Sequence, residues 1–230
     1  MKALVAILVV LALLGGAFVA VDRVAVGFAD SAISQVLTSS LRLSQEPTTK
    51  IQGFPFLTQW GSGSYQEIDV SAPSVTSNSV TVDQVTAIVR GVVAPAFATS
   101  PSQFAGATAR QITLTGTVPF SELPVPPGFQ ARADGGQLEV TGTESLFGVQ
   151  AQVTALVSVH VSGSRVTFQP TSVQVAGSPL GASIVRAITA RLQQTISIGQ
   201  LPFGVSVTDL AVTPAGLAVT GAATNASFSG

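Results

Sequence analysis

The chain has 230 residues, a formal net charge of −1 and only 9% charged residues. So small a charge excludes a basic surface for nucleic acid and a polybasic patch for anionic lipid. Cys is absent and His160 is the one histidine, which excludes thiol proteases, thiolate and multi-histidine metal sites, and a disulfide framework.

The first predicted element is a membrane segment at the N-terminus. The 19 residues from Ala3 to Val21 are uncharged and lie between Lys2 and the pair Asp22 and Arg23. As a helix rising about 1.5 Å per residue, this run nearly spans a hydrocarbon core of about 30 Å. Positive charge precedes the run, and the two charges after it cancel. We therefore expect one span in the plasma membrane, with the domain on the extracytoplasmic (periplasmic) side.

Whether this segment is removed depends on the residues beside the cleavage site. Signal peptidases need small residues at the first and third positions before the cut. Cleavage after Ala20 places Phe18 at the third position and is disfavoured, whereas cleavage near Ala17 places Gly15 there and is acceptable. The sequence favours an uncleaved signal anchor over residues 1–22 and leaves a cleaved signal peptide open.

Two amphipathic helices are predicted after the membrane segment. The first runs from Arg23 to Leu43 as a continuation of that segment, and its apolar residues recur at near 3.6-residue spacing. They are Val26, Ile33, Val36, Leu37 and Leu41. The second runs from residue 181 or 182 to Thr195. Its apolar stripe consists of Ile184, Val185, Ile188, Leu192 and Ile196.

Between these helices the apolar period changes to two, which is typical of half-buried strands. The clearest such segments are Thr108 to Val118, Gln137 to Thr143 and Ala151 to Val161. Within them we expect Leu138 and Val140 to face inward and Glu139 outward. The proline-rich stretch from Pro119 to Gly136 predicts a long loop, and Pro214 to Gly216 predicts the turn of a closing hairpin.

Several predicted strands change phase part-way, at Asp83 and Gln84, at Pro170, and at Thr208 and Asp209. Such shifts are typical of bulges and bends, which allow a sheet to coil. The sequence thus predicts an α+β fold: a long, strongly curved antiparallel β-sheet (half-barrel) of about seven or eight strands wrapped around helices, with an N-terminal membrane helix. We expect the domain at residues 23–222 and a frayed tail at 223–230.

Motifs with catalytic potential are weak. His160 lies on the polar face of its predicted strand, as a solvated histidine does. Glu67 and Asp69 share one face of a strand, and a carboxylate pair can hydrolyse glycosides, but such neighbours are more often simply exposed. The stretch from Gly61 to Ser64 lacks the spacing of a nucleophile turn and is interpreted as a flexible link. We therefore expect a non-catalytic protein without cofactor or metal.

Apolar side chains are common in the predicted turns, where no core strand demands them. They are Phe54, Phe56, Leu57, Trp60, Phe97, Phe104, Phe120, Phe129 and Phe147. Each alone is more often a core residue than a ligand contact. Together they predict a rim of apolar surface, as a lipid-binding or membrane-touching end would need.

Part of this set also carries a family resemblance. The run Gly53-Phe54-Pro55-Phe56-Leu57-Thr58-Gln59, then Gly63-Ser64-Tyr65, then Ile68 and Val70, resembles the signature of the LmeA-like phospholipid-binding proteins of actinobacteria. The strand from Val80 to Val93 also fits, as does Leu201-Pro202-Phe203 before the closing hairpin. The similarity covers nearly the whole chain after the anchor.

The resemblance implies a cell-envelope protein whose fold is similar to the tubular lipid-binding domains, with an apolar groove beside a helix. It implies phospholipid and the outer face of the plasma membrane as partners, together with an envelope-assembly protein. The implied role is to shuttle or present lipid for envelope lipid or lipoglycan assembly. The alternative is an anchored envelope scaffold that binds a protein or glycan without lipid transfer. In a groove, each buried CH₂ would contribute about 0.8 kcal/mol, and Arg90, Arg110 or Arg132 are candidates to pair with a headgroup phosphate.

Overall fold

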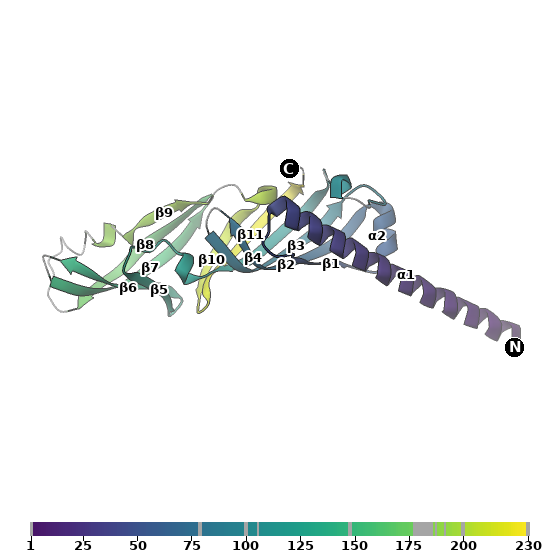
Figure 1. Ribbon diagram of the computed structural model, residues 1–230, viewed down its shortest axis with the longest axis horizontal. Helices are drawn as coiled ribbons and strands as arrows, with labels where there is room; N and C mark the ends of the chain where they lie inside the picture. Colours follow the sequence, from purple (N-terminus) through teal and green to yellow (C-terminus); the bar gives the residue numbers. More distant parts are fainter. Residues whose placement is uncertain are drawn as a thin grey trace. The chain divides into compact units, whose positions relative to one another are not determined.

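The structure is a computed structural model that describes residues 2–77, 80–98, 101–104, 106–146, 149–176, 186, 188–190, 192–198 and 201–228. Its helices are α1 (Lys2–Leu41) and α2 (Phe56–Ser62), with short 3-10 turns at Pro101–Phe104, Phe120–Glu122 and Pro202–Gly204. Its strands, drawn in Figure 1, are β1 (Thr48–Gln52), β2 (Ser64–Ser77), β3 (Val80–Val93), β4 (Thr108–Val118), β5 (Phe129–Asp134), β6 (Gln137–Leu146), β7 (Val149–Ser162), β8 (Arg165–Ala176), β9 (Gln194–Ser197), β10 (Ser206–Thr213) and β11 (Gly216–Ser227).

These strands form two open sheets. One has the order β1-β2-β3-β4-β11-β10 and the other the order β5-β6-β7-β8-β9. The predicted α+β class, with mainly antiparallel curved sheets and few helices, is confirmed, and neither sheet closes, as in a half-barrel. The described residues contain eleven strands, more than expected. The chain also divides into two compact units: unit 1 (Met1–Ala72, Thr86–Ile112 and Thr224–Gly230) and unit 2 (Pro73–Val85 and Thr113–Ala223).

In unit 1, helix α1 is continuous from the apolar N-terminal segment into the domain, as predicted. Its second half packs against β1 and α2, while its first half extends beyond the strands (Figure 1). Residues 8–21 are all exposed, and Asp22 is the first of the described side chains of α1 that is buried. Beyond that point polar side chains hold the helix in place. The Ser34 hydroxyl donates to Thr49 Oγ1 over 2.9 Å, and the Ile51 N–H donates to Asp30 Oδ1 over 2.8 Å.

In unit 2, the long strands of the five-stranded sheet bury one face. Val153, Ala155 and Val157 of β7 are at most 2% exposed, which confirms the predicted alternation of that strand. Two of the predicted phase shifts are register shifts in the structure. One lies between Leu156 and Val157, where β8 contributes the extra Thr171 beside Pro170, and the other lies between Val207 and Asp209. The third coincides with Gln84, which has a φ of 51°.

The structure corrects two expectations about loops and helices. The predicted loop from Pro119 to Gly136 contains strand β5, which pairs with β6 across the turn at Gly135 and Gly136. Of the second predicted helix, the described residues 186, 188–190 and 192 are helical, but Gln194–Ser197 is strand β9, so Ile196 lies in a sheet. The rest of that helix lies outside the described residues.

Three further differences concern two short segments and one residue. The stretch from Gly61 to Ser64 is an ordered helix end and not a flexible link, because Gly63 caps α2 with a φ of 67° and β2 begins at the next residue. Glu139 lies on the face opposite Leu138 and Val140 as expected, yet it is only 6% exposed. Strand β11 extends to Ser227, so residues 223–227, expected to fray, are part of the sheet.

Candidate functional site

The turn between β1 and α2 is built around a carboxylate supplied by α1. The first N–H groups of a helix lack partners within it, and Pro55, at the N-cap of α2, offers no side-chain hydrogen bond. Instead the buried Asp22 Oδ1 accepts from the Leu57 N–H over 2.8 Å. A negative charge at a helix N-terminus is favourable, so Asp22 acts as an N-cap provided by another helix. Its second oxygen has no hydrogen-bond partner in the described part of the chain.

Gln59 joins the two strands on either side of this turn. Its side-chain Nε2 donates to the Gln52 carbonyl over 3.0 Å, and its Oε1 accepts from the Gln66 N–H over 2.9 Å. Gly53, with a φ of 98°, has no room for a side chain, because a Cβ there would lie 2.8 Å from Gln59 Nε2. These residues of the Gly53-to-Gln59 run therefore form a structural joint.

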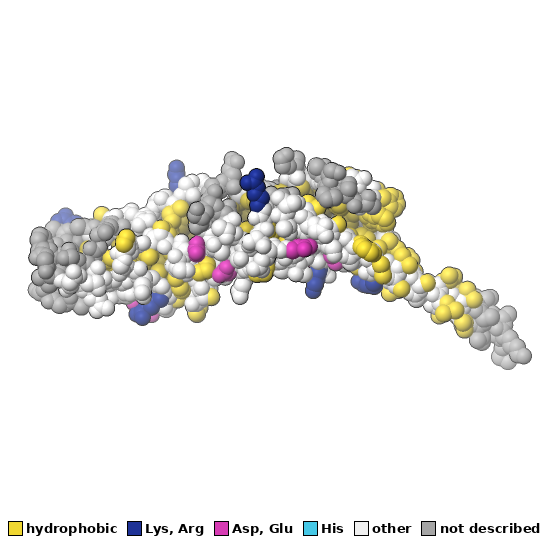
Figure 2. All heavy atoms as spheres, viewed as in Figure 1, with side chains coloured by type: hydrophobic (Ala, Val, Ile, Leu, Met, Phe, Trp, Pro, Cys, Tyr) yellow, Lys and Arg dark blue, Asp and Glu magenta, His cyan; other side chains and the backbone are white. Residues whose placement is uncertain are grey.

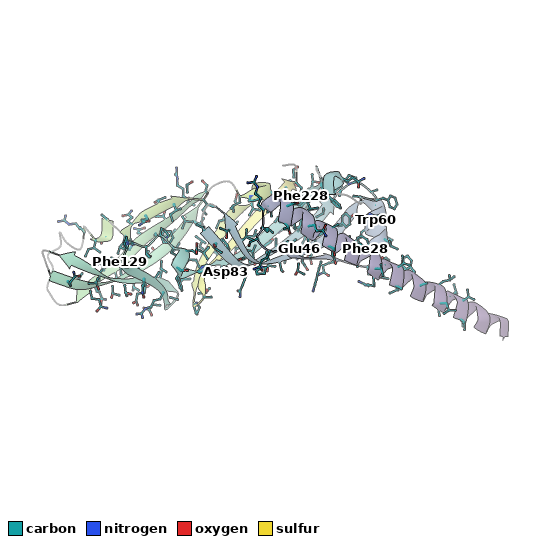
Figure 3. All side chains as sticks on the ribbon, in the orientation of Figure 1. Phe28, Glu46, Trp60, Asp83, Phe129 and Phe228 are labelled. Carbon is teal, nitrogen blue, oxygen red and sulfur yellow. The ribbon has the colours of Figure 1, made fainter. Side chains whose placement is uncertain are left out.

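Aromatic rings pack around α2. Phe56, only 3% exposed, lies between Trp60 and Tyr65, with both pairs of ring centroids 6.4 Å apart. Burial raises the pKa of Tyr65 above its ordinary value. Trp60, labelled in Figure 3, meets Phe97 edge-to-face at 5.2 Å and donates its indole N–H to the Ala98 carbonyl over 2.9 Å. Phe56 is thus part of the core of unit 1, and Trp60 is half-buried.

Two rings of this group remain largely exposed. Phe54 is 52% and Phe97 60% exposed. The Phe54 ring also meets the Phe18 ring of α1 edge-to-face, with centroids 6.5 Å apart, and the Arg23 guanidinium lies 5.2 Å from its centroid. Hydrophobic side chains gather at this end of unit 1 and continue onto the projecting part of α1 (Figure 2). Trp60 and Phe97 are thus in contact beside α2, and Phe54, in the turn before α2, is in contact with α1; that these residues form a lipid-binding rim stays a prediction.

The other predicted apolar positions do not share one location. Leu57 is half-buried on α2. Phe104 and Phe120 are half-buried in separate 3-10 turns, in unit 1 and unit 2 respectively. Phe129, at the start of β5, is only 7% exposed and belongs to the core of unit 2. Phe147 lies outside the described residues.

A shallow apolar pocket lies in unit 2, at residues that were not predicted as a site. The loop Leu123-Pro124-Val125-Pro126 forms one wall, and buried residues of the five-stranded sheet form the other. The sheet side and its edge contribute Leu138, Val140, Val157, Phe168, Leu192 and Gln194. The cavity volume is about 20 Å³, which is room for about one water molecule and far below the size of a small-ligand site. Gln194 is the only side chain in this lining that carries a polar group.

The three arginines proposed for a headgroup differ in their surroundings. The Arg90 Nε lies 2.6 Å from Glu67 Oε2, and the Arg132 Nε lies 3.0 Å from Glu139 Oε1. The buried Glu139 carboxylate of β6 therefore has a charged partner on the neighbouring strand β5. Arg110 is exposed beside Gly91 and has no ion-pair partner in the described part of the chain. Of the three, Arg110 is the one whose charge is not already paired.

The groups with catalytic potential do not form a constellation. His160 is exposed on β7. Glu67 is paired with Arg90, and Asp69 Oδ2 accepts from the Gln52 side chain over 2.6 Å. Among the described residues there is no group of three or more His, Asp or Glu side chains that could hold a metal ion.

The fold and these surfaces define an α+β domain with an apolar pocket and an exposed aromatic end, joined to a helix long and apolar enough to cross a membrane. The family model for LmeA-like phospholipid-binding proteins matches residues 20–222, so the chain belongs to that family, as its resemblance indicated. Family membership supports lipid binding. No curated protein and no solved structure is significantly similar to the chain.

Proposed function

We propose that this protein is an anchored phospholipid-binding module on the extracytoplasmic side of the plasma membrane, which presents or shuttles lipid for envelope lipid or lipoglycan assembly. Family membership over residues 20–222, together with the apolar pocket of unit 2, supports this proposal most directly. The exposed apolar half of α1 and the lysine that precedes it support the anchor and its orientation.

In this proposal an acyl chain lies between the loop at residues 123–126 and the inner face of the five-stranded sheet. The buried side chains there are Leu138, Val140 and Phe168, which offer no polar group, so each inserted CH₂ contributes about 0.8 kcal/mol. At about 20 Å³ the cavity is smaller than an acyl chain, so binding requires the loop at residues 123–126 to move away from the sheet. Arg110, whose charge is free to pair with a phosphate, is proposed as a separate headgroup contact within unit 1.

The test uses the full chain in nanodiscs that contain a phospholipid with a diazirine at the end of one acyl chain. After irradiation, peptide mapping separates lipid bound in the pocket from lipid around α1. We expect labelling within residues 123–140. The variant Val125→Trp, which fills the mouth, should lower that labelling by about tenfold, because overpacking costs about 1–3 kcal/mol.

The matched control is Val80→Trp. Val80 is also in unit 2, is 38% exposed and does not line the pocket, so labelling should be unchanged. If labelling is confined to α1 in the unmodified chain, the pocket does not bind lipid and the scaffold alternative gains. Labelling within 123–140 that the Val125→Trp variant does not reduce would also contradict the proposed site.

A further inference from the structure

We infer that the α2 end of unit 1 docks on the bilayer, with the exposed rings of Phe54 and Phe97 in the interfacial layer of the leaflet from which α1 emerges. This inference rests on the part of the proposed function that places the segment before Asp22 in the membrane. It does not require lipid in the pocket of unit 2, so the two proposals fail separately.

The contacts of Phe54 with α1 set the depth of its ring in the bilayer. The uncharged run ends at Val21, and its 19 residues are just long enough for the hydrocarbon core, which places Val21 near the core boundary. Phe18 lies about 4–5 Å deeper along the helix, and helical side chains tilt further toward the N-terminus. The Phe54 ring lies 6.5 Å from the Phe18 ring and 5.2 Å from the guanidinium of Arg23, which follows the run, so Phe54 lies at about the level of this boundary.

Contacts with Asp22 and Arg23 of α1 hold the α2 end of unit 1 in place relative to that helix. The Leu57 N–H donates to Asp22, the first residue after the uncharged run, over 2.8 Å. The next residue, Arg23, places its guanidinium 5.2 Å from the centroid of the Phe54 ring. A cation beside an aromatic ring at the end of an apolar helix matches the headgroup layer, where phosphates, aromatic rings and arginine meet. A bilayer is therefore favoured over a protein as the occupant of this surface.

The remaining exposed rings complete the surface. Phe97 is 60% exposed and packs against Trp60, whose indole N–H is already satisfied by Ala98. The chain has a net charge of −1, so apolar contact rather than attraction to anionic lipid must supply the binding. About half of each ring is available for burial, which corresponds to about a three- to tenfold change in the docked-to-undocked ratio per ring.

Trp60 is the single tryptophan of the chain and reports directly on this surface. In nanodiscs of phosphatidylcholine that holds bromine atoms near the top of the acyl chains, we expect the full chain to show strong quenching of Trp60 and weak quenching by aqueous iodide. Fluorescence that iodide quenches and brominated lipid does not would overturn the inference, and would leave this surface facing water or a protein.

Substitutions separate docking from mere proximity. Phe54→Ser is expected to lower the docked-to-undocked ratio about three- to tenfold, since half the ring is lost from the interface. The matched control Val80→Ser, in unit 2, should leave Trp60 quenching unchanged. Phe97→Asn, which accepts the positive φ of 55° at that position, should act like Phe54→Ser. If neither substitution changes the quenching, the rings do not hold the surface on the bilayer. In the same nanodiscs, unchanged acyl-chain labelling in unit 2 would show that only docking has been altered.

Discussion

The cap that Asp22 provides to α2 leads to the sharpest prediction. Asp22→Ala removes the acceptor of the Leu57 N–H and leaves that donor without a partner at a half-buried position. Loss of an N-cap costs about 0.5–2 kcal/mol, and a buried unpaired donor costs about 1–3 kcal/mol. The second Asp22 oxygen is itself buried without a partner, so its removal offsets part of the cost. We expect a net local destabilisation of about 1–2 kcal/mol.

The measurement is amide hydrogen exchange of α2 in the full chain, purified in nanodiscs. A loss of about 1–2 kcal/mol in local stability should speed exchange of the Leu57 amide by about five- to thirtyfold. Asp22→Asn keeps the acceptor oxygen and should have a much smaller effect. The control Asp134→Ala, at an exposed carboxylate in unit 2, should leave α2 unchanged. An unchanged rate in Asp22→Ala, or an equal effect of the alanine and asparagine variants, would refute the capping role.

Two further predictions concern the same region. Gly63→Ala should lower the free energy of unfolding by about 3 kcal/mol or more, because its φ of 67° is left-handed and a Cβ would strike the Ala94 carbonyl. Gly163→Ala, with a φ of 58° but nothing within 4 Å of its Cβ, should cost only about 1–2 kcal/mol. Denaturant titrations followed by circular dichroism measure both losses, and equal losses would contradict the steric argument. Burial raises the pKa of Tyr65, the single tyrosine of the chain. The folded state therefore favours the neutral phenol. This contribution to the free energy of unfolding is fully present below about pH 10 and is lost as pH rises through the folded-state pKa. Tyrosinate absorbance should show this late titration in the folded chain, and Tyr65→Phe should remove the corresponding loss of stability at alkaline pH.

Strands that bury one face could be predicted from the sequence, because apolar residues recur at every second position along them. The alternation in β7 and the phase shifts near Pro170 and Thr208 appear in the structure as a buried face and as two register shifts. Strand β5 was missed because it follows a proline-rich stretch and has charged residues at Arg132 and Asp134. Its pairing with β6 comes from the hairpin and not from its own pattern.

Helix α2 was missed for a different reason. At seven residues it is too short to show a period, and its first turn is capped by Asp22, which lies 35 residues earlier in the chain. A contact so distant in sequence leaves no local signal. The ion pair of Glu139 is similar, since only the hairpin brings Arg132 beside it.

The candidate site was predictable in composition but not in place. The sequence indicated apolar residues in turns, and Phe54 and Phe97 are indeed exposed, whereas Phe56 and Phe129 fill two different cores. The local sequence around a phenylalanine beside a turn does not indicate which side of the sheet its ring will face. The pocket of unit 2 had a faint signal in Leu123-Pro124-Val125-Pro126, an apolar run that the prolines keep out of a regular strand.

The position of Asp22 also bears on how the localisation of such a protein can change in evolution. All described side chains of α1 before Asp22 are exposed, so most of that segment lies outside the packed core of unit 1. In the proposed anchored form, Phe18 is the residue that disfavours cleavage after Ala20, and a single Phe18→Ala substitution would give that site the small-residue pattern that signal peptidases need. On that proposal one codon separates a tethered protein from a secreted one, and the change removes one ring contact, that of Phe18 with Phe54.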